Sequence, residues 1–92
     1  MYKLIRNFPY MKVREKADDI FLKALGNRIA TIRKEKHITQ IELSYRCDIE
    51  KTNMRRIEAG NTNPTILMLK KICNGLGISL PELLEFTTET AE

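Results

Sequence analysis

The chain has 92 residues, of which 42% are hydrophobic and 30% charged, and its formal net charge is +4. This length suits one domain with a modest core, and no apolar run approaches the roughly 20 residues that cross a bilayer. Charged residues interrupt the apolar N-terminus, so we expect neither a membrane segment nor a secretory signal. These features favour a cytoplasmic protein.

Residues 1–18 are predicted to form a flexible basic arm. Residues 1–17 hold five Lys and Arg side chains against one Glu, whereas basic and acidic residues are equal in number over 18–92. A basic arm on a neutral body suits a polyanion such as nucleic acid, although a solvated leader has a similar composition. Its apolar side chains could instead pair two subunits or fold back on the body, and these alternatives stay open.

A first helix is predicted over about residues 19–36, with Asp18–Asp19 as its N-cap. Apolar residues recur at helical spacing from Phe21 onward and should face the core. We expect the helix to stop at His37, because histidine tolerates the left-handed conformation of a helix C-cap. His37 is the single histidine of the chain and has no convergent acid pattern, so it indicates neither a catalytic base nor a metal site.

Two short helices should follow. Thr39 and Glu42 form the T-x-x-E pattern of a capping box, which opens a helix that reaches about Cys47. After a break at 48–49, a third helix is predicted over about 50–58.

The third and fourth helices are predicted from their inward apolar positions. Met54 and Ile57 should point inward from the third helix, and Gly60 should end it. Pro64 is expected at or near the first turn of the fourth helix. The expected core face of that helix comprises Ile66, Leu69, Ile72, Cys73 and Leu76.

Gly75 and Gly77 are expected to close the fourth helix. Ser79 and Glu82 form a second capping box, which predicts a last helix over 80–86. No strand pattern occurs between 18 and 92, so the expected class is all-α.

Two short helices with a break of three to four residues are what a DNA-binding helix-turn-helix requires, since the second helix must be presented outward. In the order and spacing of its motifs, the chain resembles the phage-repressor and Cro-like (XRE-type) helix-turn-helix family over about residues 25–86. The matching segments are Leu25–Arg33, Thr39–Leu43, Ile57–Gly60, Asn63–Thr65, Leu76–Ile78 and Leu83–Leu84. The resemblance implies a five-helix, lambda-repressor-like DNA-binding domain over 19–86, followed by an acidic, disordered tail over 87–92.

The resemblance also implies a transcriptional regulator that binds palindromic DNA as a homodimer, without catalysis, cofactor, metal or small-molecule substrate. The residues that it assigns to DNA binding are Thr39, Gln40, Lys51, Thr52, Asn53, Arg55, Arg56 and Asn61. Arg and Lys suit guanine, Asn suits adenine, and the methyl group of Thr can meet that of thymine. Lys51, Thr52 and Arg56 are the strongest candidates for base contact, whereas Arg55 and Asn61 are assigned to phosphate.

Two further assignments come from the resemblance. Gln40 opens the second helix, where its amide and the helix N-terminus can both meet a phosphate. Arg33 and Glu58 match a pair that forms an internal salt bridge in the family, so their expected role is structural.

Three positions depart from the family pattern. Asp48 stands where the turn usually has Gly, and Ser44 replaces a usual Ala. Glu50 stands where Ser or Thr usually caps the recognition helix. Its carboxylate either reads the N4 amino group of cytosine or weakens DNA affinity, and the sequence leaves both open.

Dimerisation has two candidate surfaces in the sequence, the N-terminal arm and the last helix. The apolar residues of that helix are Leu80, Leu83, Leu84 and Phe86. A rival function is a protein-interaction module of the same fold, either an antitoxin or a coactivator. A small enzyme is disfavoured, because no nucleophile–base, metal or cofactor spacing occurs. Cys47 and Cys73 lie in helical patterns outside any CxxC pair, so we expect buried free thiols.

Overall fold

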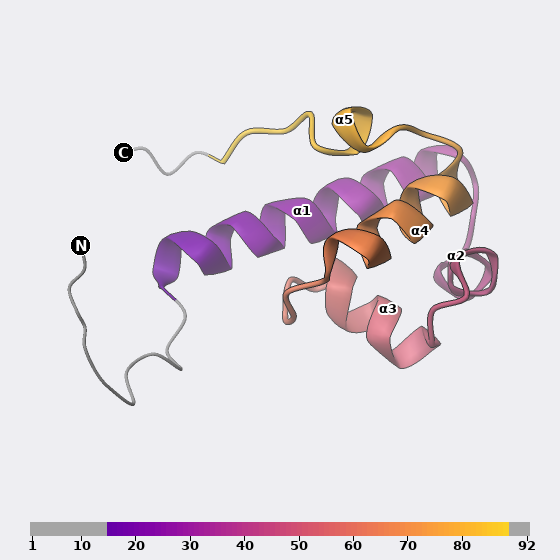
Figure 1. Cartoon of the computed structure of the whole chain (residues 1–92), viewed down its shortest axis with the longest axis horizontal. Helices are drawn as coiled ribbons and strands as arrows, with labels where there is room; N and C mark the ends of the chain where they lie inside the picture. Colours follow the sequence, from indigo (N-terminus) through magenta and orange to yellow (C-terminus); the bar gives the residue numbers. More distant parts are fainter. Residues whose placement is uncertain (1–14, 89–92) are drawn as a thin grey trace.

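The computed structural model describes residues 15–88, and within that range all regular structure is helical. The helices of this range are α1 (Lys16–Glu35), α2 (Gln40–Cys47), α3 (Lys51–Glu58), α4 (Ile66–Leu76) and α5 (Leu80–Leu83). Helix α1 packs on α3, while α4 packs on both α2 and α5 (Figure 1). The all-α class is therefore confirmed.

Most of the predicted arm and tail falls on residues 1–14 and 89–92, which lie outside the described residues. Across residues 15–88, no helix combines the length and the apolarity needed to cross a membrane.

Helix α1 begins at Lys16, before the predicted position 19. The predicted cap is wrong, because Glu15 occupies the N-cap and its carbonyl accepts from the backbone amides of Asp18 (3.0 Å) and Asp19 (3.1 Å). The Lys and Ala before Asp18 are good helix formers, so the helix extends to include them. Both aspartates consequently lie in the first turn, where they stabilise the positive end of the helix dipole. At the other end, His37 is left-handed with φ 59°, as predicted.

Hydroxyl side chains cap three of the helices. Each hydroxyl oxygen accepts a hydrogen bond from the backbone amide three residues later. Thr39 accepts from Glu42 (3.0 Å), Thr65 from Met68 (3.1 Å) and Ser79 from Glu82 (3.2 Å). Ser79 and Glu82 complete the predicted reciprocal capping box. The predicted box at Thr39 is only half-formed, because the carboxylate of Glu42 accepts from Arg46 at 2.8 Å instead.

Helix α4 begins and ends slightly away from the predicted positions. Pro64 precedes the N-cap residue Thr65 and so lies outside the first turn. Gly75 lies inside the helix, and Gly77 ends it with φ 74°. At Gly75 a β-carbon would meet the sulfur of Cys47 at 2.5 Å, so α2 and α4 approach closely at this point.

Helix α5 ends at Leu83, short of the predicted residue 86. The guanidinium of Arg28, from α1, donates to the carbonyl oxygens of Glu82 (2.8 Å) and Leu83 (3.2 Å). The carbonyl of Glu82 also accepts from the backbone amide of Glu85 at 3.3 Å, and Arg28 supplies a side-chain donor to both carbonyls where the helix ends. The long first helix thus holds the last one in place.

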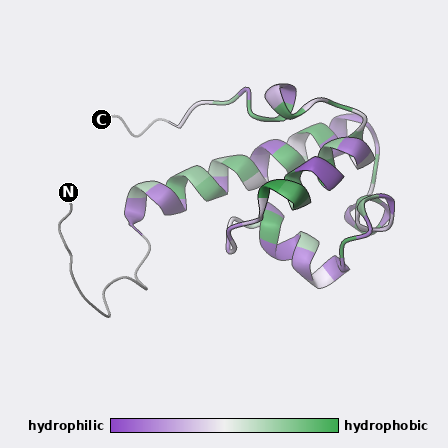
Figure 2. Ribbon diagram, viewed as in Figure 1, coloured by the Kyte–Doolittle hydropathy of each residue, from purple (hydrophilic) through white to green (hydrophobic). Residues whose placement is uncertain are grey.

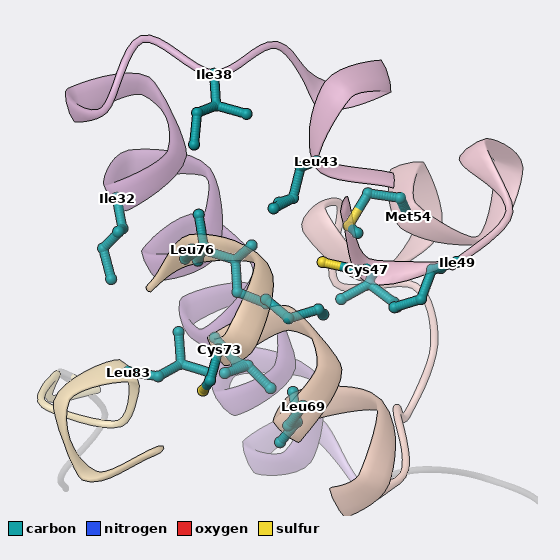
Figure 3. Packing of buried hydrophobic residues seen from close by; sticks show 14 of the residues in the cluster. Ile32, Ile38, Leu43, Cys47, Ile49, Met54, Leu69, Cys73, Leu76 and Leu83 are labelled. Atoms are coloured by element: carbon teal, nitrogen blue, oxygen red, sulfur yellow. The ribbon is translucent and has the colours of Figure 1, made fainter. Parts of the chain in front are cut away.

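The core draws apolar residues from every helix of the described range and from the loops at Ile38 and Ile49 (Figure 3). Its fully buried side chains are Ile29, Leu43, Met54, Ile57, Ile72 and Leu83. The inward direction predicted for Met54 and Ile57 is confirmed.

The prediction that Ile66 and Phe21 face the core is wrong. Ile66, the first residue of α4, is 60% exposed. The opening turns of α4 consequently carry apolar residues at the surface, where the ribbon is strongly hydrophobic (Figure 2). Phe21 is 47% exposed, and its ring lies against Phe86 with centroids 5.4 Å apart.

Both cysteines are buried and free, as predicted. Burial is the main cause that raises the pKa of the Cys47 thiol to about 11, and burial likewise raises the pKa of Cys73. Both therefore stay neutral thiols at physiological pH, which makes them poor nucleophiles.

Candidate nucleic-acid interface

Helix α3 presents one polar face to solvent. Met54 and Ile57 anchor its inner side in the core, being 0% and 2% exposed. At 100° per residue, the opposite face carries four exposed side chains. They are Lys51, Thr52, Arg55 and Arg56. The structure thus brings together the three predicted base-reading residues on one exposed face, and α3 lies at one edge of the molecule (Figure 1).

The two predicted asparagines lie in different surroundings. Asn53 is half-buried on the flank of α3, where its amide nitrogen lies 3.9 Å from the sulfur of Met68. It therefore points toward α4 rather than along the open face. Asn61 is exposed just after α3, and its backbone amide donates to the carbonyl of Arg56 at 2.9 Å. Asn61 thus borders the open face at its C-terminal end.

The turn before α3 has the geometry that outward presentation requires. Asp48 adopts the left-handed conformation with φ 55°, which its short polar side chain tolerates better than most. The backbone amide of Ile49 donates to the carbonyl of Ser44 at 3.0 Å and so closes the end of α2. The chain therefore reverses tightly without the usual glycine.

An ion pair joins α1 to the C-terminal end of α3. The Nε of Arg33 donates to Oε2 of Glu58 at 2.8 Å, and its Nη2 donates to Oε1 at 3.0 Å. The two side chains are only 11% and 6% exposed. Arg33 also donates to the carbonyl of Ile38 at 3.0 Å, which ties the loop after α1 to the same point.

Gln40 has a partner that sequence reasoning missed. Its Nε2 donates to Oε1 of Glu58 at 2.8 Å, so the first residue of α2 contacts the last residue of α3. Thr39 remains exposed at the N-cap beside it. A separation of 18 positions carries no periodic signal, and contacts of this kind are visible only in three dimensions.

A second missed feature is a cleft of about 490 Å³ beside the turn between α2 and α3. It is lined by Ile41, Ser44, Tyr45, Asp48, Ile49, Glu50 and Lys51. Ile41 is 47% and Tyr45 82% exposed, although both are large. The sequence did contain a signal for this exposed pair, because Ile41 and Tyr45 have i, i+4 spacing on the face of α2 opposite the buried Leu43. Glu50 makes no side-chain cap bond at the start of α3, and it is one of the residues that line this cleft.

A tight turn between two short helices, with an exposed basic second helix, defines the helix-turn-helix class of DNA-binding protein. Residues 29–83 match the family model described as helix-turn-helix (HTH_3), and the chain belongs to this family of transcriptional regulators. It is therefore a regulator and not an enzyme.

Curated and solved relatives agree with this assignment. The chain is 35% identical over 68 residues to the uncharacterized HTH-type transcriptional regulator y4dJ of Sinorhizobium fredii, covering 74% of this chain and 88% of that protein. It is 34% identical over 64 residues to control protein C.BamHI of Bacillus amyloliquefaciens, covering 68% and 79%. The restriction-modification controller protein C.AhdI from Aeromonas hydrophila matches with a TM-score of 0.68 over 70% of this chain and 97% of that chain, and at 23% identity this likeness shows the fold.

Proposed function

We propose that this chain is a sequence-specific transcriptional regulator that binds palindromic operator DNA as a homodimer, acting in the cytoplasm on the nucleoid. One observation carries the proposal: α3 buries Met54 and Ile57 and presents Lys and Arg side chains on its opposite face. The major groove admits an α-helix, and such side chains can reach its base edges. The DNA-binding domain then extends over 19–86, as the sequence predicts.

Each exposed residue has a proposed role that follows from its place. Lys51 and Arg56 donate to guanine O6 and N7, and Thr52 offers its methyl group to thymine. Arg55 and Asn61, toward the edge of the open face, bind phosphate. Asn53 lies on the flank of α3, so we assign it to the edge of the contacted groove.

The start of α2 forms a second proposed contact. Thr39 and Gln40 stand at a helix N-terminus, where backbone amides and the helix dipole favour a phosphate. A phosphate contact there would fix the orientation and depth at which α3 enters the groove.

Dimerisation follows from the short reach of α3, which spans only Lys51–Glu58. Such helices read few base pairs, and two-fold dimers place them at half-sites about 34–36 Å apart. The interface expected on the last helix needs revision, because Leu83 is fully buried in the monomer. Ile66 and Leu67, 60% and 67% exposed on α4, and Leu84, 39% exposed at the C-cap of α5, are apolar side chains available for pairing instead.

Selection of bound duplexes from random DNA tests this function. A two-fold dimer should enrich a palindrome, and log K should fall linearly with log salt, with a slope of about −0.9 for each phosphate neutralised. A rival antitoxin or coactivator would instead show weak binding without enrichment and would co-purify with a protein partner. Failure to enrich any sequence would reject the proposal.

Replacement of Arg56 separates base reading from phosphate binding. Arg56→Ala should stay folded, because the side chain is exposed, and should lose roughly 1–3 kcal/mol of discrimination at one position of each half-site. Arg55→Ala is the matched control on the same helix, and it should weaken all duplexes by a similar factor. Competition gel shifts with single-base operator variants measure both. An Arg56→Ala protein with the wild-type sequence preference would refute the assignment.

A further inference from the structure

The two helices of the helix-turn-helix are joined at both ends. At one end the chain itself runs from Cys47 through the left-handed residue Asp48 into α3. At the other end, the side chain of Gln40 bonds to that of Glu58 at 2.8 Å. Gln40 is the first residue of α2 and Glu58 the last of α3, so this bond is as far from the turn as the two helices allow.

This second junction is anchored to the body of the protein. Glu58 accepts from Gln40 and Arg33 on the same oxygen, Oε1, and from Arg33 again on Oε2. A neutral amide suits this position, because it satisfies the carboxylate without competing for the charge of Arg33. The contact therefore holds α2 against a part of α3 that is already fixed.

We propose that Gln40 is a positioning residue for sequence recognition, which fixes the angle between α2 and α3 through Glu58. The inference rests on the proposed function and deepens it. If the N-terminus of α2 grips a phosphate, that angle decides where the side chains of Lys51 and Arg56 meet the base edges. Gln40 then couples the backbone grip to the reading of sequence.

A change in the angle between α2 and α3 should affect phosphate binding and base reading unequally. The attraction of Lys and Arg to phosphate varies slowly with distance, so a small rotation of α3 leaves it nearly unchanged. Bidentate hydrogen bonds to bases weaken steeply when their geometry is distorted. Loss of the junction should consequently reduce binding to the operator more than binding to unrelated DNA.

Gln40→Met tests the inference, because methionine keeps the length of the side chain and the backbone amide but cannot donate to Glu58. Dissociation constants are measured for the selected operator and for an unrelated duplex of equal length, well below the melting temperature. We expect operator affinity to fall about tenfold and affinity for the unrelated duplex to fall less than about twofold. Asn61→Ala is the control, and as a phosphate contact it should lower both affinities by the same factor.

The outcomes distinguish the possible roles of Gln40. If Gln40 only stabilised the fold, the substitution would change only the fraction of folded protein, and both apparent affinities would fall equally. Titration with excess operator DNA measures the fraction of protein that is competent to bind. Equal losses on both duplexes, or an unchanged operator affinity, would overturn the inference. If the wild-type protein enriches no sequence at all, the proposed function falls first and this inference falls with it.

Discussion

Arg33→Ala is expected to lower the free energy of unfolding by about 3–5 kcal/mol, which is a large part of the total stability of a domain of this size. The substitution leaves the carboxylate of Glu58 nearly buried with Gln40 as its remaining side-chain donor. A buried charge without its counter-ion costs far more than the intact pair contributes. The Arg33→Ala substitution also removes the hydrogen bond from Arg33 to the carbonyl of Ile38, which holds the loop after α1.

Urea denaturation followed by circular dichroism measures this loss. Arg46→Ala is the matched control, because it breaks the 2.8 Å ion pair between Arg46 and Glu42. The side chains of this pair are 46% and 47% exposed. That change should stay within about 0.5 kcal/mol of wild type, as is usual for solvated pairs. Similar values for the two variants would show that the Arg33–Glu58 pair is not the structural tie proposed.

Gly26→Ala should also destabilise the protein strongly. In an ordinary helix interior this change is favourable by about 1 kcal/mol. Here α1 crosses α3 so closely that a β-carbon would fall on the backbone carbonyl oxygens of Ile57 and Glu58. Backbone cannot rotate away as a side chain can, so the helices must separate, and we expect a net loss of about 2 kcal/mol or more.

Gly77→Ala separates this crowding from backbone strain. Gly77 has φ 74° and open space around it, so alanine there should cost only about 1 kcal/mol. Thermal melts of both variants make the comparison. Because Gly26 lies under the C-terminal end of α3, its replacement should also weaken operator preference, whereas Gly77→Ala should leave it intact. A Gly26→Ala protein as stable as wild type would contradict the close crossing.

Sequence reasoning succeeded where the physical signal is local. The caps at Thr39 and Ser79, the left-handed residue His37 and the inward pair of α3 all depend on residues within one or two turns of each other. It failed at α1 because Asp is a strong N-cap type, yet the good helix formers before Asp18 carry the helix further.

The remaining errors depend on what lies across the core. Ile66 fits the apolar period of α4, yet among the described residues it is left 60% exposed. The early end of α5 is set by Arg28, which lies 55 positions from its partner Leu83. The contact of Gln40 with Glu58 is likewise long-range. Helix faces can be read from a sequence, whereas the relative placement of helices cannot.

Methylation interference tests most directly whether α3 enters the major groove. Guanine N7 and adenine N3 are both methylated by dimethyl sulfate, and they lie in the major and the minor groove respectively. On the selected operator, N7 methylation should block binding at guanines in both half-sites, and Arg56→Ala should abolish the effect at one guanine of each. Binding that tolerates every N7 methyl group but fails with adenine N3 methylation would contradict major-groove reading by Lys51 and Arg56.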